Sequence, residues 1–114
     1  MGLPELPISK AAVRVPTLGS HAESLTLRFK RPVESLYALR ALLRHSPVVE
    51  VIDDPENERY PMPMTSTYKH AVEVGRTRYN LIYGNQGIDM LVSGDQLLRD
   101  ASLNAYEIMQ LISA

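Results

Sequence analysis

The 114-residue sequence contains no cysteine. That absence excludes disulfides, thiolate metal sites and a cysteine nucleophile supplied by this chain. The three histidines, His21, His45 and His70, lack the short spacing of metal ligands, so we expect no metal site. The acidic run over residues 53–58 lacks the alternation and the glycine of a calcium loop, and we interpret it as a solvated turn.

Long apolar runs and a strong net charge are missing as well. No stretch approaches the roughly 20 apolar residues that span a bilayer. The first ten residues do not resemble a secretory leader, so we expect a cytoplasmic protein. The formal net charge is -1 at pH 7 and the basic residues are dispersed, which argues against nucleic acid or a membrane surface as partners. A hydrophobic content of 45% is ordinary for one globular domain.

Hydrophobic periodicity predicts the elements of one α+β domain. Leucines at helical spacing predict a helix over 34–45 with Arg40 and Arg44 facing outward, and a second apolar stripe predicts a last helix with Asp100 as its N-cap. The order of elements lacks regular βαβ alternation, which favours a mixed, mostly antiparallel sheet covered by helices and closed by a C-terminal helix. The expected strands are 11–15, 23–30, 48–52, 71–79 and 88–94.

Arg14 and His21 form the clearest candidate site. They stand seven positions apart, and in an uninterrupted strand an odd spacing would send the two side chains to opposite faces. Pro16 and Gly19 lie between them, and a positive φ at the glycine would turn the chain and bring the side chains together. A guanidinium would hold a carboxylate or phosphate, and an imidazole would exchange a proton. The residues alone also allow a packed histidine, which the shared parity of His21 with Leu25 favours.

The remaining histidines and two arginines have simpler interpretations. His45 lies at the end of the first predicted helix and should interact with its C-terminal dipole, whereas His70 should be a solvated loop residue. Arg76 and Arg78 share a strand face, which indicates either a second anion contact or an ion pair at an interface. We favour the interface.

Four segments resemble the C-terminal half of aspartate-semialdehyde dehydrogenase, in order and at nearly the same spacing. They are "AVRVPTLGSHAES", "VVEVIDDPENERYPMPM", "VEVGRTR" and "SGDQLLRDASLNAYEI". The resemblance implies part of an NADP-dependent enzyme that reduces aspartyl phosphate to aspartate semialdehyde, on the route to lysine, threonine and methionine. It also implies an incoming linker over 1–10, a dimerisation and catalytic domain over 11–98, and a C-terminal helix over 99–114 that packs on a nucleotide-binding domain.

The resemblance also implies roles for single residues. Arg14 would bind the carboxylate of a small acidic metabolite, and His21 would be the acid/base catalyst. Asn104 would contact the cofactor, while Asp100 stands where the family usually has glycine. The nucleophilic cysteine and the nucleotide-binding fold belong to the N-terminal half, so we expect a fragment or a separately encoded half. Such a chain would be inactive alone, bind no cofactor alone, and form a homodimer or larger assembly.

Two other interpretations stay open. One is a non-catalytic dimerisation or interaction module that kept this fold. The other is a half of an N-acetylglutamyl-phosphate reductase, for which the spacing of Arg14 and His21 is less suitable.

Overall fold

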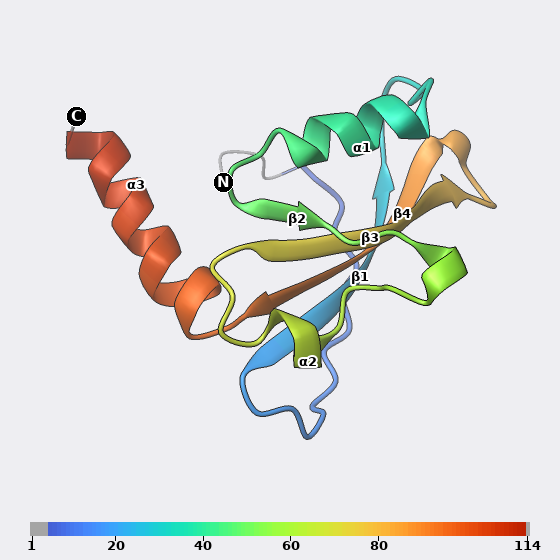
Figure 1. Ribbon diagram of the computed structural model, residues 1–114. Coiled ribbons are helices and arrows are strands. Elements are labelled where there is room, and N and C mark those ends of the chain that lie inside the picture. Colours follow the sequence, from blue (N-terminus) through green and yellow to red (C-terminus); the bar gives the residue numbers. More distant parts are fainter. Residues whose placement is uncertain (1–4, 114) are drawn as a thin grey trace.

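The structure is a computed structural model that describes residues 5–113 (Figure 1). At its centre lies one four-stranded sheet in the order β1-β4-β3-β2. The strands β1 (Ser20–Arg28) and β3 (Val72–Asn80) pair antiparallel with β4 (Gly84–Asp95), and β2 (Val49–Val51) pairs parallel with β3. The sheet is therefore mixed and mostly antiparallel, and the predicted α+β class is confirmed.

Two helices pack against this sheet. Figure 1 shows α1 (Leu36–Arg44) above β2 and β3, and the short α2 (Pro63–Ser66) below β3. The N-cap of α1 is Ser35, whose Oγ accepts a hydrogen bond from the Ala38 N–H at 3.2 Å. The loop between β2 and α2 holds a 3-10 turn, η1 (Pro55–Asn57).

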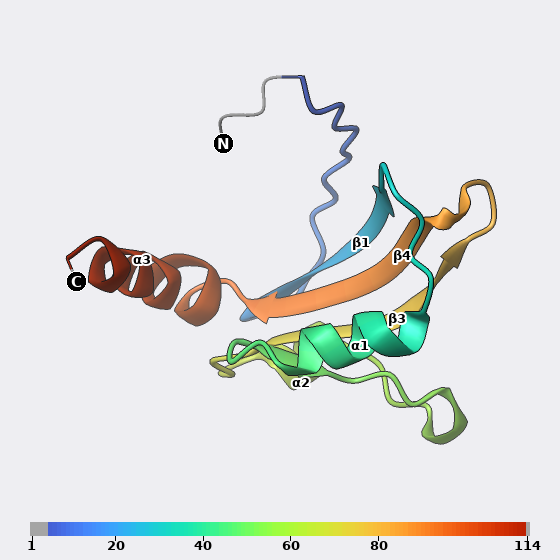
Figure 2. The ribbon, with the colours of Figure 1, turned by 90° about the horizontal axis from the view of Figure 1, so that it is seen from above.

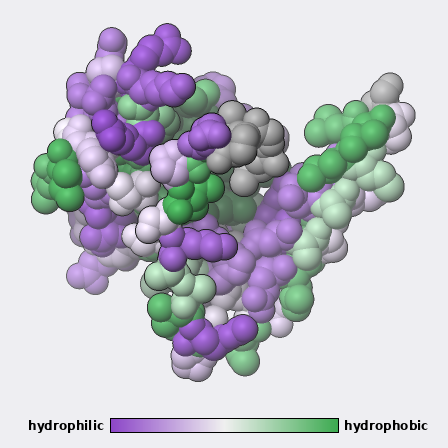
Figure 3. Space-filling view, turned by 180° about the vertical axis from the view of Figure 1, so that it is seen from behind, coloured by the Kyte–Doolittle hydropathy of each residue, from purple (hydrophilic) through white to green (hydrophobic). Residues whose placement is uncertain are grey.

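The chain after β4 forms a π-helical turn, η2 (Leu98–Leu103), that continues directly into α3 (Asn104–Ser113). Arg99 in η2 and Glu107 in α3 form a bidentate ion pair, which lowers the pKa of the Glu107 carboxyl and raises the pKa of Arg99. From this junction α3 projects away from the sheet (Figure 2). Its apolar side chains are exposed, as the hydrophobic colouring along the protruding helix shows (Figure 3).

The apolar core is small. Its buried hydrophobic residues in the described part of the chain are Val74, Ile88 and Met90. The helix α1 adds a row of three leucines on the sheet-facing side, as its periodicity predicts: Leu36, Leu39 and Leu43.

The outward orientation predicted for Arg40 is wrong. Arg40 is four residues from Leu36 and so shares the inner side of α1. It donates from Nε to Asp53 Oδ2 at 2.9 Å and from Nη2 to the Thr77 carbonyl at 2.7 Å. The solvated turn predicted over 53–58 is also wrong at its first residue, because the Asp53 side chain is only 3% exposed.

Two predicted elements differ from the structure near the chain ends. Residues 11–17 do not form a strand. Their apolar side chains are not packed against the sheet, as the 81% exposure of Val13 shows. Pro16 also lacks a backbone donor for strand pairing. The last α-helix begins at Asn104, so Asp100 is not its N-cap but lies inside η2, where its carboxylate contacts His21.

Gly75 marks the closest approach between β3 and the chain that leaves β2. A Cβ atom at Gly75 would lie 1.9 Å from the Ile52 carbonyl oxygen and 2.8 Å from Pro61 Cδ. Gly84 contrasts with it, because a Cβ there would meet open space although the backbone has φ +55. The first glycine is required for space and the second for conformation.

We expect Gly75→Ala to lower the free energy of unfolding by about 3 kcal/mol or more, because backbone atoms cannot yield to the new methyl group. Gly84→Ala should cost about 1 kcal/mol, the penalty of a left-handed backbone for an L-residue. Chemical denaturation of both variants measures the difference. Losses of equal size would contradict the close approach at Gly75.

Candidate functional site

His21 lies near the start of β1 and lines an open cleft between the sheet and η2. The cleft has a volume of about 300 Å³. Alternate residues of a strand share a face, so His21 and Glu23 project into it together. The opposite wall comes from η2, and the lining residues are His21, Glu23, Val72, Val92, Gly94 and Asp100.

The imidazole of His21 is flanked by two carboxylates. Its Nε2 lies 2.6 Å from Asp100 Oδ2 and 3.9 Å from Glu23 Oε1. The His21 side chain is 47% exposed and that of Asp100 33%, so solvent reaches the pair. Both contacts become ion pairs when the imidazole is protonated, and both approach the same nitrogen. The cleft is therefore acidic around its one imidazole.

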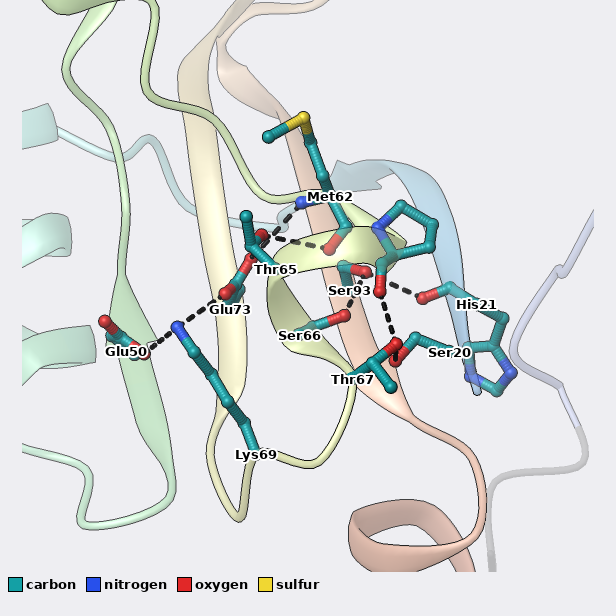
Figure 4. Close-up of polar contacts among 11 residues, drawn as sticks. Ser20, His21, Glu50, Met62, Thr65, Ser66, Thr67, Lys69, Glu73 and Ser93 are labelled. Carbon is teal, nitrogen blue, oxygen red and sulfur yellow. Dashed lines mark hydrogen bonds and ion pairs between the residues drawn. The ribbon is translucent and has the colours of Figure 1, made fainter. Parts of the chain in front are cut away.

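A buried polar layer fixes the backbone of His21 from the other face of the sheet (Figure 4). The Ser93 hydroxyl donates to the His21 carbonyl at 2.9 Å and shares a 2.8 Å hydrogen bond with Ser66 in α2. Next to it, the hydroxyls of Ser20 and Thr67 lie 3.0 Å apart. We call these four residues the serine–threonine layer; it couples the start of β1 to α2.

A buried carboxylate holds α2 and its loop against β3. Glu73 is 0% exposed and accepts hydrogen bonds from the Met62 N–H at 3.2 Å, the Thr65 hydroxyl at 2.7 Å and Lys69 Nζ at 2.7 Å. Lys69 also donates to Glu50 at 2.8 Å, and the hydrogen bonds to Glu50 and Glu73 raise the pKa of Lys69. Lys69 therefore stays charged at neutral pH and balances the buried acid. Figure 4 shows this chain of contacts.

Asp95 organises the turn that carries Asp100. Its carboxylate accepts hydrogen bonds from the backbone N–H groups of Leu98 at 2.8 Å, Tyr68 at 2.8 Å and Leu97 at 2.9 Å. These hydrogen bonds, that from Leu98 first, hold the pKa of Asp95 below its usual range. The position of Asp100 beside His21 thus depends on an ionised Asp95 at the end of β4.

The segment before β1 does not turn in the way that its sequence predicts. Thr17 makes the turn, donating its N–H to the Val15 carbonyl at 2.9 Å and its hydroxyl to the Ser20 carbonyl at 2.8 Å. Gly19 has no positive φ, so that expectation is wrong. A Cβ at Gly19 would lie 2.7 Å from Thr67 Cγ2, so glycine is present for space. Arg14 lies exposed in this segment, and its convergence with His21 stays a prediction.

Other candidate residues lie where single contacts explain them. His45 is the C-cap of α1, with Nδ1 2.7 Å from the Ala41 carbonyl, which confirms its position at the helix end. His70 is exposed. Asn104 is the exposed first residue of α3, and its contact with a cofactor stays a prediction.

The lining of the His21 cleft does not fit a dinucleotide. Glu23 and Asp100 would repel phosphate groups, and the sequence has no glycine-rich turn between a strand and a helix. Within residues 5–113, no group of three His, Cys, Asp or Glu side chains could hold a metal ion. In the same part of the chain, every helix is too short or too polar to cross a membrane.

Sequence reasoning missed the contacts that hold this site. The sequence predicts Asp100 as an N-cap and shows it as a departure from a family pattern, but it does not predict the contact of its carboxylate with His21. The buried Glu73 had one detectable signal, an acid placed between two valines of a predicted strand. Ser66 and Ser93 gave no signal beyond their small size, because their pairing joins segments far apart in the chain.

The fold places the chain among α+β domains built on a mixed, mostly antiparallel sheet. Residues 1–99 match the family described as "Semialdehyde dehydrogenase, dimerisation domain". The chain belongs to this family, and the resemblance to aspartate-semialdehyde dehydrogenase is confirmed.

Relatives of known sequence and structure agree with this assignment. The chain is 36% identical over 105 residues to aspartate-semialdehyde dehydrogenase of Campylobacter jejuni, covering 92% of this chain and 30% of that protein. The Synechocystis enzyme is 35% identical over 108 residues, covering 95% of this chain and 31% of that protein. Aspartate semialdehyde dehydrogenase II from Vibrio cholerae, complexed with ASA, superposes with a TM-score of 0.77 at 25% identity, covering 88% of this chain and 29% of that one. The chain thus spans about a third of its curated relatives' length.

The pKa of Asp95 makes the fold sensitive to acid. Because this pKa is lower in the folded state than the roughly 3.9 of an unfolded chain, the stabilisation is complete above about pH 4 and is lost as the pH falls through the folded value. We expect the melting temperature to fall below about pH 4, and Asp95→Asn to lower it at neutral pH while flattening the acid decline. Part of the decline remains, since hydrogen bonds from Asn80 and Thr26 also lower the pKa of Asp89.

Thermal unfolding at several pH values measures this effect. Glu56→Gln is the matched control, since it removes one negative charge from an exposed position in η1. An acid decline equally steep in wild type and Asp95→Asn would contradict the role of Asp95.

Proposed function

We propose that the chain is the substrate-binding and dimerisation portion of an aspartate-semialdehyde dehydrogenase. The complete enzyme would reduce aspartyl phosphate to aspartate semialdehyde with NADP, in the cytoplasm, for the synthesis of lysine, threonine and methionine. The observation that carries the proposal is a histidine in the family's "RVP…H" position that lines an open cleft on a matching dimerisation domain. The Campylobacter jejuni and Synechocystis relatives are both named aspartate-semialdehyde dehydrogenase, which favours this substrate over N-acetylglutamyl phosphate.

The two candidate residues have separate roles in this proposal. The planar guanidinium of Arg14 binds the substrate carboxylate through two parallel hydrogen bonds. His21 gives and takes a proton at the reacting carbonyl, from a backbone that Ser93 holds in place. The carboxylates of Asp100 and Glu23 lie beside the imidazole, at 2.6 Å and 3.9 Å from its Nε2.

The remaining chemistry belongs to an N-terminal half. This chain has no cysteine, so the nucleophile must come from that half, together with the fold that binds NADP. Asn104, at the start of α3, is the residue of this chain that we assign to the cofactor. The exposed apolar side chains of α3, within the predicted 99–114 unit, would pack on the nucleotide-binding domain, and the chain alone would be inactive.

Mixing the chain with a cysteine-bearing, nucleotide-binding half tests this proposal. We expect the mixture to regain phosphate-dependent oxidation of aspartate semialdehyde, measured as NADP reduction. His21→Ala should lower the rate at least about 100-fold, the usual contribution of acid–base catalysis, and Arg14→Ala should mainly raise KM. His70→Ala, in an exposed loop, is the control and should leave the rate unchanged.

The same experiment distinguishes the enzyme proposal from the alternative of a non-catalytic interaction module. The absence of a cysteine from this chain favours that alternative. If a properly folded partner half binds the chain and no activity returns, the enzyme proposal fails and the module remains.

We also expect the chain to form a dimer or a larger assembly, because α3 exposes a row of apolar side chains in water. Light scattering of the chain over a range of concentrations measures the assembly. A double variant, Met109→Ser with Ile112→Ser, should shift the equilibrium toward the monomer, since these side chains are 56% and 81% exposed.

The matched control for that shift is Leu42→Ser, which removes a leucine 71% exposed on the separate helix α1. It should leave the assembly unchanged. A monomer at the highest concentration of the wild-type chain would refute self-association.

A further inference from the structure

A second open cleft lies apart from the His21 cleft and shares no lining residue with it. It has a volume of about 300 Å³, near the lower end of ligand-binding pockets. Its walls come from α1, the loop after β2 and the middle of β3, where the pairing with β4 is irregular. The residues that matter for the argument are Arg40, Asp53, Tyr60, Arg76, Thr77 and Arg78.

The acid of this cleft is fully engaged by the fold. Asp53 Oδ1 accepts the Arg76 N–H at 3.0 Å, and Oδ2 accepts the Thr77 N–H at 3.1 Å and Arg40 Nε at 2.9 Å. Since its side chain is 3% exposed, Asp53 has little surface left for a ligand. The charges of Asp53 and Arg40 therefore cancel inside the protein.

Two guanidinium groups remain on the open side of the cleft. Arg78 is 56% exposed and lies 3.4 Å from Asp89, with Nη1 donating to the Arg76 carbonyl at 3.2 Å. Within residues 5–113, the Arg76 guanidinium has no carboxylate within 4.0 Å. The cleft thus carries one uncompensated positive charge, and it belongs to Arg76.

Arg76 is held in a conformation that costs energy. Its φ is +53, in the left-handed region that non-glycine residues rarely adopt. The hydrogen bond from its N–H to Asp53 fixes the backbone, and the guanidinium lies 4.9 Å above the ring of Tyr60. The Arg76 side chain is thus held at its backbone and at its guanidinium, so it loses little conformational freedom when it binds a ligand. Backbone strain of this kind concentrates at ligand-binding positions.

Thr77 adds a polar group to the wall beside Arg76. It is 2% exposed, and its hydroxyl has no hydrogen-bond partner among the described residues. Buried hydroxyls are nearly always paired, so this unpaired hydroxyl in a lining residue next to Arg76 is an exception that a bound ligand or water would explain.

We propose that this cleft binds a small oxyanion, a phosphate or a carboxylate group, with Arg76 as its main ligand and Arg78 as the second. The forked guanidinium presents parallel N–H donors that match two oxygens of either group. The site does not depend on the function assigned to His21, because the two clefts have no residue in common.

Titration of the isotope-labelled chain with inorganic phosphate and with succinate, at constant ionic strength, tests the proposal by NMR. We expect saturable amide shifts at Tyr60, Arg76 and Thr77. Arg76→Gly should weaken binding about tenfold or more, because it removes a charge-assisted hydrogen bond. Glycine accepts a φ of +53 without strain, so the variant keeps the fold and its spectrum confirms this.

Arg28→Ala is the matched control. It removes a guanidinium that also lies over a tyrosine, 5.3 Å from the Tyr83 ring, outside the cleft. Phosphate should bind this variant as it binds the wild type. The proposal fails if no shift saturates, if Arg76→Gly and Arg28→Ala bind phosphate equally, or if Arg76→Gly alters only the oligomeric state.

Discussion

The buried carboxylate of Glu73 is the interaction on which the rest of the structure depends. A fully buried charge costs several kcal/mol unless donors surround it, and Glu73 meets three donors only when the loop from Met62 to Lys69 lies against β3. That single arrangement brings Ser66 and Thr67 beneath β1. The serine–threonine layer then fixes the backbone of His21, so the position of the candidate acid/base group follows from a carboxylate on another strand.

Polar contacts hold these elements in place because the apolar core is small. Within residues 5–113 the buried hydrophobic residues are Val74, Ile88 and Met90. Many other large apolar side chains lie on the surface, where those of α3 and of the loop between β3 and β4 are exposed. A domain with this distribution gains further stability from a partner, which agrees with a dimerisation domain that spans about a third of its relatives' length.

The sequence predicts elements better than it predicts contacts. The helix α1 and the strands β3 and β4 follow from apolar periodicity, a local property, and the resemblance to a known family located the His21 position. Arg40 was expected in solvent because charge usually is, but its acceptors on Asp53 and Thr77 come from distant segments. Asp100 has the chemistry of an N-cap, yet η2 takes the turn where the cap was expected and aims the carboxylate at His21. The contacts of Arg40 and Asp100 depend on which distant segments meet in the fold, and the periodicity of a single segment does not predict this.

The charges around the His21 cleft constrain how an acidic metabolite would bind. Glu23 and Asp100 converge on the imidazole, and the lining contains no lysine or arginine. A substrate carboxylate would therefore need a cation from outside the lining. Arg14 precedes β1 in an exposed segment, and within residues 5–113 no carboxylate lies within ion-pair distance of it. Under the proposed function Arg14 supplies this cation, so the exposed segment before β1 is the part of the chain that completes the substrate site.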